Sequence, residues 1–534
     1  MSATSLIIPY GFHPFDICYD YPTFWYYVKI AFVILCFFSH ILYCYVFLSL
    51  FHPKQKKSIS HSYSPSKTSK LCLLVGETEQ QQPIYLSEKG LYQNILITGT
   101  IGCGKTSSAM YPFCKQLLSY EANNPSKKIG MLVLDVKGNF YQQVMVCAKQ
   151  YSRLQDVILI GPHSPHTYNP LDKPFLTPTV LANRLKTILT LLSPNNTESF
   201  WLDKVEQLLS ESIRLCRLYC NGYVTFSEIH KLIHNSRYYQ EKIEQLKQSF
   251  HKNLLSEKEL HDLLSCIDFF ENEFFQLDSR TSSILKSELS RITSPFLSDY
   301  QMKKHFCCPK SAITFSGFQE VLAKGKIVVF VMPIAEYTNL AKIMSCYLKL
   351  DFQSEVLLQL KNPPSEHHTS CFLCDEFQEL VTSTDASFFS QSREAKCINI
   401  LATQSFSSLL NTLNNENQTK VILQSLTNKL CFRTDDIYTI ELLQKQLGKE
   451  EKEKISKSIS ENAQETNYNY FLHSFLSNHS NLSESISSYY QTDYIYDTQF
   501  FTQQLETFSC LSFLSDGNQI LPPQKLKLYP YFKK

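Results

Sequence analysis

Short apolar runs alternate with helix-compatible stretches from residue 71 to about 175, and again from residue 316 to about 450. This alternation is typical of a mostly parallel β-sheet whose strands are joined by helices, so the sequence predicts an α/β fold. The apolar runs predict strands at residues 71–75, 94–98, 131–135, 157–160, 327–333, 369–374, 398–402 and 429–434.

The alternation stops between residues 176 and 315, where apolar positions follow a helical spacing. In residues 201–209 and 283–289, apolar side chains recur at intervals of three and four, which is the period of one helix face. We therefore expect an all-α domain inserted into the α/β fold. The segments on either side of it, 71–175 and 316–450, would form the two parts of the α/β domain.

The chain changes character again after residue 450. Residues 451–497 are rich in Ser, Asn, Glu and Tyr and have little apolar periodicity, so we expect a partly mobile segment there. Residues 498–534 contain apolar runs once more and are predicted to return to the α/β domain.

Near the N-terminus, residues 30–51 contain no charged side chain and are almost wholly apolar. A helix of this length covers about 33 Å, enough to cross a bilayer. The following segment, 52–70, carries five lysines and no acid, whereas residues 1–28 carry two aspartates and no Lys or Arg. The positive-inside rule then predicts one transmembrane helix, an extracytoplasmic segment at 1–29, and a cytoplasmic linker at 52–70 that leads to the bulk of the chain.

Composition narrows the function classes. The chain has 534 residues, of which 43% are hydrophobic, so it is long enough for more than one domain with a real core. A formal net charge of +2 excludes a globally basic nucleic-acid binder but not a local basic channel. The 18 cysteines are scattered, mostly in apolar runs, which favours reduced cytosolic thiols over disulfides or a zinc site.

A complete phosphate-binding motif, G-x-x-x-x-G-K-[ST], directly follows the predicted strand 94–98. A phosphate cradle needs this order of buried strand, glycine-rich turn and helix N-terminus, because backbone N–H groups and the helix dipole then face the anion. Lys105 would reach the β- and γ-phosphates, and the Thr106 hydroxyl would bind Mg²⁺. The residues predicted to bind a nucleoside triphosphate are Gly99, Thr100, Ile101, Gly102, Cys103, Gly104, Lys105, Thr106 and Ser107.

A site of this kind also needs an acid at the end of a second buried strand, to hold Mg²⁺ through water. Asp135 and Asp375 both end predicted strands, but only Asp375 is followed by a second acid, Glu376. Hydrolysis requires a carboxylate that orients the attacking water. We therefore predict Asp375 as the metal residue and Glu376 as the catalytic base.

Two polar residues near the predicted strand 398–402 are further candidates. Gln404, just after it, would sense the γ-phosphate or cap the next helix. Arg393, just before it, would act as an arginine finger on a neighbouring subunit's phosphate or lie on the surface as a solvated side chain. A finger acting between subunits requires a ring or another assembly with a subunit interface.

Several motifs together resemble the type IV secretion coupling proteins, the TraG/TraD-type ATPases of conjugation. Besides the phosphate-binding motif, the resemblance rests on Leu134-Asp135-Val136-Lys137-Gly138, Tyr168-Asn169-Pro170-Leu171, Phe200-Trp201, Asp375-Glu376-Phe377, Ala402-Thr403-Gln404-Ser405 and Asn428-Lys429-Leu430-Cys431-Phe432-Arg433. They occur in the family's order and cover residues 30 to about 450.

The resemblance implies an inner-membrane protein with a RecA-like nucleotide domain and an all-α domain. It also implies a homo-hexamer that recruits relaxase-bound single-stranded DNA and uses ATP and Mg²⁺ to drive its delivery to the channel proteins of a type IV secretion system. The roles of Lys105, Thr106, Asp375, Glu376, Gln404 and Arg393 given above agree with the family's roles for matching residues. Two alternatives remain, a coupling ATPase for protein effectors and a nucleotide-binding membrane docking platform with little turnover.

Overall fold

The computed structural model describes residues 23, 26–27, 30–39, 41, 71–135, 137–193, 199–251, 256–462, 468–469, 474–475 and 481–532. The chain divides into two compact units, Met1–Ser62 and Tyr63–Lys534.

In the first unit, residues 30–39 and 41 are helical, and their apolar side chains are exposed. Among the described residues, no helix is both long enough and apolar enough to cross a bilayer. The remainder of the predicted span 30–51, the linker 52–70 and most of the segment 1–29 lie outside the described residues.

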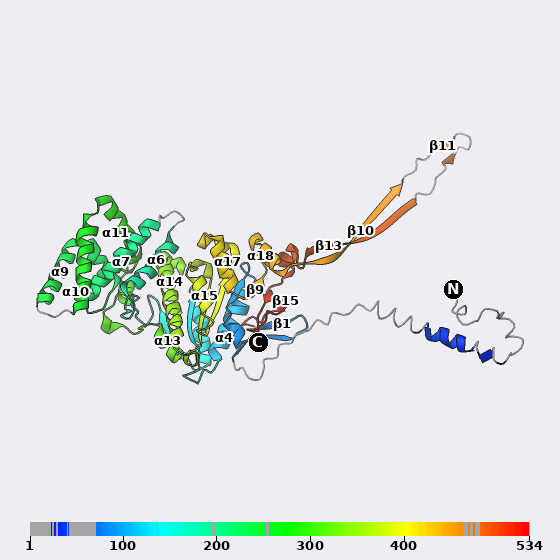
Figure 1. The fold of residues 1–534 in the computed structure, drawn as a ribbon, viewed down its shortest axis with the longest axis horizontal. Coiled ribbons are helices and arrows are strands. Elements are labelled where there is room, and N and C mark those ends of the chain that lie inside the picture. Colours follow the sequence, from blue (N-terminus) through cyan, green and yellow to red (C-terminus); the bar gives the residue numbers. More distant parts are fainter. Residues whose placement is uncertain are drawn as a thin grey trace, which may run out of the picture. The chain divides into compact units, whose positions relative to one another are not determined.

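The second unit is built on one eleven-stranded sheet with the strand order β2-β1-β15-β14-β9-β3-β8-β7-β4-β6-β5 (Figure 1). All neighbours from β9 to β5 pair in parallel, whereas β2, β1, β15 and β14 extend the sheet beyond β9 by antiparallel pairing. The strands are β1 (Cys72–Thr78), β2 (Pro83–Ser87), β3 (Ile95–Thr98), β4 (Gly130–Asp135), β5 (Val157–Ile160), β6 (Ile327–Phe330), β7 (Ser370–Asp375), β8 (Cys397–Thr403), β9 (Asn428–Phe432), β14 (Ser509–Phe513) and β15 (Gln524–Lys527). The predicted strands and the mostly parallel α/β fold are confirmed.

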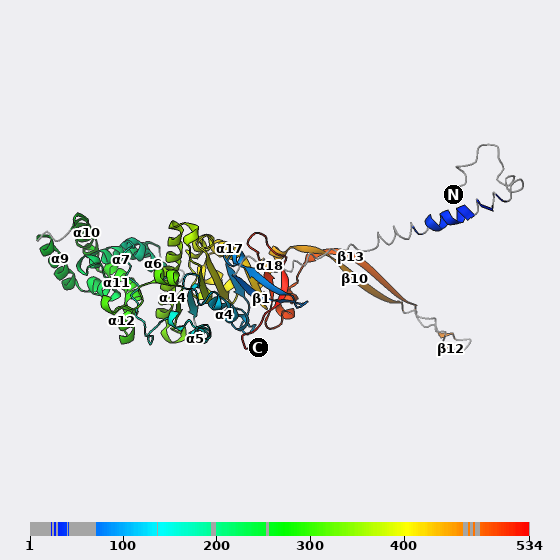
Figure 2. The same ribbon diagram turned by 90° about the horizontal axis from the view of Figure 1, so that it is seen from below.

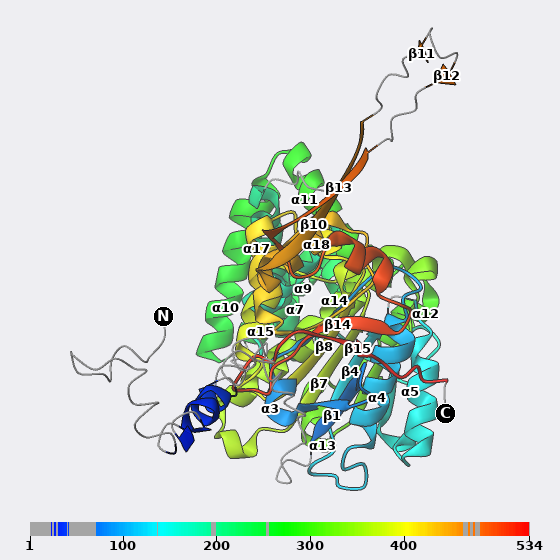
Figure 3. The same ribbon diagram turned by 90° about the vertical axis from the view of Figure 1, so that its right-hand side faces the viewer.

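Side chains alternate between the two faces of the sheet along each strand. Because the central strands carry apolar side chains on both faces, helices cover both faces. In β3, Ile95 and Ile97 pack into the core beneath the helices that follow β3 and β4, whereas Leu96 packs into the core on the other face. Figures 2 and 3 show α4 and α5 on one side of the sheet and α14 and α17 on the other. The covering helices are α4 (Tyr111–Ser119), α5 (Phe140–Gln150), α14 (Ile334–Leu358), α15 (Asp385–Gln391), α16 (Phe406–Leu413), α17 (Glu416–Ser425) and α18 (Ile437–Leu447), and the short α3 (Glu88–Leu91) follows β2.

Between β5 and β6, the described residues form eight α-helices and no strand. Their buried side chains belong to the same cluster as those beneath α14, so the helices share a core with one face of the sheet. The division of this unit into an all-α domain at 176–315 and a nucleotide domain stays a prediction. The helices are α6 (Pro178–Leu192), α7 (Ser199–Tyr219), α8 (Phe226–His234), α9 (Ser236–His251), α10 (Glu257–Asp268), α11 (Ser279–Thr293), α12 (Tyr300–Phe306) and α13 (Phe318–Lys324).

One buried carboxylate connects α14 to the helical segment. Asp351 accepts hydrogen bonds from the hydroxyl of Tyr168 (2.8 Å) and from Nη1 of Arg184 (2.9 Å), and it pairs with Nζ of Lys173 (2.7 Å). Burial alone would raise the pKa of Asp351, but the two cations outweigh it and hold the pKa below its usual value. The contacts of Tyr168 give a structural reason for the Tyr168-Asn169-Pro170-Leu171 motif.

Tyr168→Phe should destabilise the protein, because it removes a hydrogen bond to a buried charge while leaving the ring in place. We expect a loss of about 1–3 kcal/mol, seen as a lower midpoint of urea unfolding. Tyr300→Phe is the matched control, because Tyr300 is 74% exposed and should change stability by no more than about 0.5 kcal/mol. Equal midpoints for the two variants would contradict this role of Tyr168.

Residues 451–497, expected to be partly mobile, contain strands that the sequence did not predict. β10 (Lys449–Asn462) pairs antiparallel with β13 (Asn481–Tyr494), and the short β11 (Tyr468–Asn469) pairs with β12 (Ser474–Phe475). In the first pair the described side chains, including Ile455 and Tyr490, are largely exposed. Neither face of this pair is buried, so its sequence shows no apolar alternation.

Candidate nucleotide-binding site

The predicted phosphate-binding loop lies at the carboxyl edge of the parallel strands, between β3 and a helical turn (Thr106–Met110) that continues into α4. Gly99, Gly102 and Gly104 have φ angles of 153°, 80° and 100°, which residues with a Cβ atom rarely adopt. At Gly104 a Cβ would also meet the ring of Phe508 at 2.5 Å. The glycines therefore allow a tight loop that ends at a helix N-terminus, the arrangement that binds phosphate.

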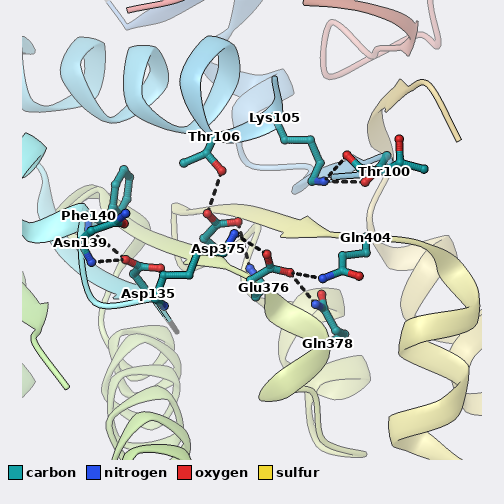
Figure 4. Close-up of polar contacts among 12 residues, drawn as sticks. Thr100, Lys105, Thr106, Asp135, Asn139, Phe140, Asp375, Glu376, Gln378 and Gln404 are labelled. Atoms are coloured by element: carbon teal, nitrogen blue, oxygen red, sulfur yellow. Dashed lines mark hydrogen bonds and ion pairs between the residues drawn. The ribbon is translucent and has the colours of Figure 1, made fainter. Parts of the chain in front are cut away.

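Lys105 and Cys103 have different surroundings within this loop. The Lys105 ammonium donates to the carbonyl oxygens of Gly99 and Thr100, the latter at 3.1 Å, so it lies across the loop (Figure 4). The Cys103 side chain is only 1% exposed and packs into the core, and burial raises the pKa of its thiol. A ligand in the loop could therefore contact the backbone of Cys103 but not its sulfur.

Two residues that are far apart in the sequence meet beside the loop. The Thr106 hydroxyl donates to Oδ2 of Asp375 at 2.9 Å (Figure 4). Asp375 ends β7 and is 3% exposed, and its burial raises the pKa of the carboxyl. A hydroxyl and a carboxylate are oxygen donors of the type that Mg²⁺ prefers, and Mg²⁺ sites of this class use few protein ligands together with phosphates and water. These two residues fit a Mg²⁺ ion.

Glu376 follows in a left-handed conformation, with φ 53° and ψ 48°. Its carboxylate accepts hydrogen bonds from Nζ of Lys137 (2.6 Å), Nε2 of Gln378 (2.6 Å) and Nε2 of Gln404 (3.2 Å) (Figure 4). Burial would raise the pKa of Glu376, but the donors, with Lys137 foremost, outweigh it and hold the pKa below its usual value. The group is thus an ionised, oriented carboxylate, as a base that positions water must be.

Asp135, the rival metal residue, is placed differently. Its carboxylate accepts the backbone N–H groups of Lys137 (2.9 Å), Asn139 (2.8 Å) and Phe140 (2.9 Å). Asp135 therefore fixes the turn after β4 and the start of α5. These backbone contacts indicate a structural role.

The structure brings Gln404 to the site but not Arg393. Gln404 reaches Glu376, and the next helix, α16, is capped instead by the Ser405 side chain. Arg393 lies before β8, at the opposite end of that strand from Gln404, where it is exposed and donates to the carbonyl of Gly517 at 3.2 Å. Strand β8 has seven residues, or about 23 Å, so Arg393 is remote from the Glu376 of its own chain.

Lys137, Gln378 and Arg433 lie at this edge and were missed as site residues. Lys137 pairs with Glu376, and a signal for it was present in the Asp-x-Lys-Gly element, Asp135 to Gly138. The carbonyl of Arg433, after β9, accepts the N–H of Thr100 at 2.9 Å and so supports the loop. Arg433 ends the motif from Asn428 to Arg433 that resembles the coupling proteins, but nothing in the sequence indicates that its carbonyl supports the loop.

The chain is similar to known proteins both in its sequence family and in its fold. The sequence model of the family described as Type IV secretory system Conjugative DNA transfer matches residues 51–473. No curated protein matches the chain. Among solved structures, the fold is similar to the unbound bacterial conjugative coupling protein TrwBdeltaN70, with 13% sequence identity, a TM-score of 0.55 and coverage of 85% of this chain and 88% of that one.

The plasmid coupling protein TrwB in complex with ADP and Mg²⁺ is also similar, with 13% identity, a TM-score of 0.54 and coverage of 85% of this chain and 89% of that one. At this identity, both likenesses show a shared fold. The family match spans most of the sequence and includes the loop, Asp375, Glu376 and Gln404. The chain belongs to the Type IV secretory system Conjugative DNA transfer family.

Proposed function

We propose that this protein is a membrane-anchored coupling ATPase that recruits relaxase-bound single-stranded DNA and drives its transfer into a type IV secretion channel during conjugation. The observation that carries the proposal is the 2.9 Å contact between Thr106 and Asp375 in a member of a conjugative DNA transfer family. It joins a phosphate-binding loop to the acidic end of a distant strand. The similar TrwB was solved with an ATP analogue, with a GTP analogue, and with ADP and Mg²⁺, which supports nucleotide binding here.

Each residue of the site would have a distinct task. The Lys105 ammonium would exchange the carbonyls of Gly99 and Thr100 for β- and γ-phosphate oxygens. Thr106 and Asp375 would hold Mg²⁺, the latter through water, and the ion supplies charge neutralisation at the phosphates. Glu376 would orient the attacking water, with Gln404 linking that carboxylate to the edge of β8.

The membrane anchor, the ring and the all-α domain are parts of the same proposal. The uncharged segment 30–51 and the five lysines after it support a single-pass anchor in the inner membrane with the bulk of the chain in the cytoplasm. The remote position of Arg393 fits a homo-hexamer in which this side chain faces a neighbour's nucleotide. The helices between β5 and β6 would form the domain that receives the cargo.

The test is ATP hydrolysis by the full chain in detergent, with and without single-stranded DNA. We expect the DNA to raise the rate and added salt to weaken that effect, because the contacts would be to backbone phosphates. Lys105→Ala should abolish hydrolysis both with and without DNA. This loss would show that the measured hydrolysis does not come from a contaminating ATPase. An absence of hydrolysis would favour the docking platform, and hydrolysis that responds to effector proteins but not to DNA would favour protein cargo.

A further inference from the structure

The segment from Phe508 to Phe532 lies directly against the phosphate-binding loop. The N–H of Phe508 donates to the carbonyl of Cys103 at 3.1 Å, and the N–H of Tyr531 donates to the carbonyl of Ser107 at 2.9 Å. Figures 1 and 3 place this C-terminal segment beside α4. The segment is thus anchored by backbone hydrogen bonds at two points, one within the loop at Cys103 and one just after it at Ser107.

Aromatic rings follow this segment across the start of α4. Phe508 packs on Gly104, the Phe508 and Phe532 ring centroids are 5.9 Å apart, and those of Phe532 and Tyr531 are 5.4 Å apart. Tyr531 meets the ring of Tyr111 edge-on at 5.2 Å. These four residues, Tyr111, Phe508, Tyr531 and Phe532, are called the aromatic rim below.

The aromatic rim is only partly covered by protein. Tyr531 is 49% exposed and Phe532 is 58% exposed, although both rings contact other aromatic rings. Tyr111, in contrast, is half-buried, and burial together with the nearby carboxylates of Asp135 and Asp375 raises its pKa to about 12. The rim therefore reaches from the neighbourhood of the acidic residues to two exposed rings.

The covalent structure of a nucleotide limits where its base can lie. Lys105 and Thr106 act at the β- and γ-phosphates, so the ribose and base must leave the cradle past its α-phosphate end. The backbone contact between Ser107 and Tyr531 puts exposed rings beside the start of the helix, next to the cradle. An aromatic face is a favourable surface for any nucleobase, because every base has a π-face to stack.

We propose that the aromatic rim is the nucleobase subsite of this protein, with Tyr531 and Phe532 as the stacking residues. The inference rests on the proposed binding of a nucleoside triphosphate at the loop. It adds that the base is held by the segment after β15.

Binding of ATP and of inorganic tripolyphosphate, each with Mg²⁺, tests the inference by titration calorimetry on the full chain. In Tyr531→Ala and Phe532→Ala we expect the affinity for ATP to fall about 5- to 150-fold, which corresponds to the loss of one stacking contact. The affinity for tripolyphosphate should not change, because this ligand has no base. Tyr531→Phe should bind ATP like the wild type, and Tyr300→Ala is the control for removing an exposed ring elsewhere.

The possible results separate the two proposals. Unchanged ATP affinity in both alanine variants would overturn the subsite, and so would an equal loss of ATP and tripolyphosphate binding, which would indicate damage to the cradle. A wild-type protein that binds neither ligand would instead overturn the proposed nucleotide binding itself.

Discussion

Glu376→Gln should leave ATP binding intact and slow hydrolysis by about 10²- to 10⁴-fold, the usual contribution of a general base. Glutamine has nearly the same size as glutamate, and its side-chain oxygen can still accept a hydrogen bond from Lys137 or Gln404. It lacks the negative charge that polarises the attacking water. Single-turnover hydrolysis and ATP affinity, measured on the same preparation, would separate the chemical step from binding.

Glu379→Gln is the matched control for this experiment. Glu379 lies three residues further on and pairs with Lys342 at 2.5 Å, away from the contacts of Glu376. The same chemical change there should leave the hydrolysis rate close to that of the wild type. Wild-type turnover in Glu376→Gln would show that another group activates the water.

Arg393→Ala should lower the hydrolysis rate of the assembled protein by about 10³-fold or more, as expected for an arginine finger. The affinity of a single subunit for ATP should not change, because Arg393 lies at the opposite end of β8 from Gln404 and contacts Gly517 instead. Lys396→Ala, on the same turn, should have little effect.

Mixing two inactive variants tests whether Arg393 acts between subunits. In mixed oligomers, an Arg393→Ala subunit keeps Glu376, and a neighbouring Glu376→Gln subunit keeps Arg393. Some interfaces then contain one intact copy of each residue, so the mixture should regain hydrolysis that neither variant shows alone. An Arg393→Ala protein with the wild-type rate would identify Arg393 as a solvated surface residue, and a mixture without activity would contradict its action between subunits.

Most of the strands that could be predicted are buried on both faces, although β1, which was predicted, is partly exposed, and β14, which is buried throughout, was missed because Ser509 and Ser512 interrupt its apolar run. Residues 131–134 and 370–374 are apolar or small throughout, and strands covered by helices on both sides have that composition. The antiparallel strands β2 and β15 were missed because exposed positions such as Pro83 and Lys527 interrupt their apolar pattern. The pair β10 and β13 was missed for a related reason, since its described side chains are largely exposed.

The local parts of the site were predictable, and the long-range contacts were not. The loop 99–106 carries its own signature, because the geometry of a phosphate cradle demands glycines and a lysine at fixed spacing. In contrast, Lys137 and Glu376 are 239 positions apart in the sequence, and only the pairing of β4 with β7 brings them together. The distinction between Asp135 and Asp375 also depends on neighbours, because both residues simply end buried strands.

The position of β14 and β15 in the sheet has a consequence for biosynthesis. Both strands leave the ribosome after every other strand of the sheet, yet they lie between β9 and β1. Until they emerge, the β1–β2 hairpin has no strand to join it to the sheet, and the loop at Gly104 lacks Phe508. A nascent chain would thus hold an incomplete sheet and an incompletely packed phosphate-binding loop until the residues from Phe508 to the end of β15 have emerged.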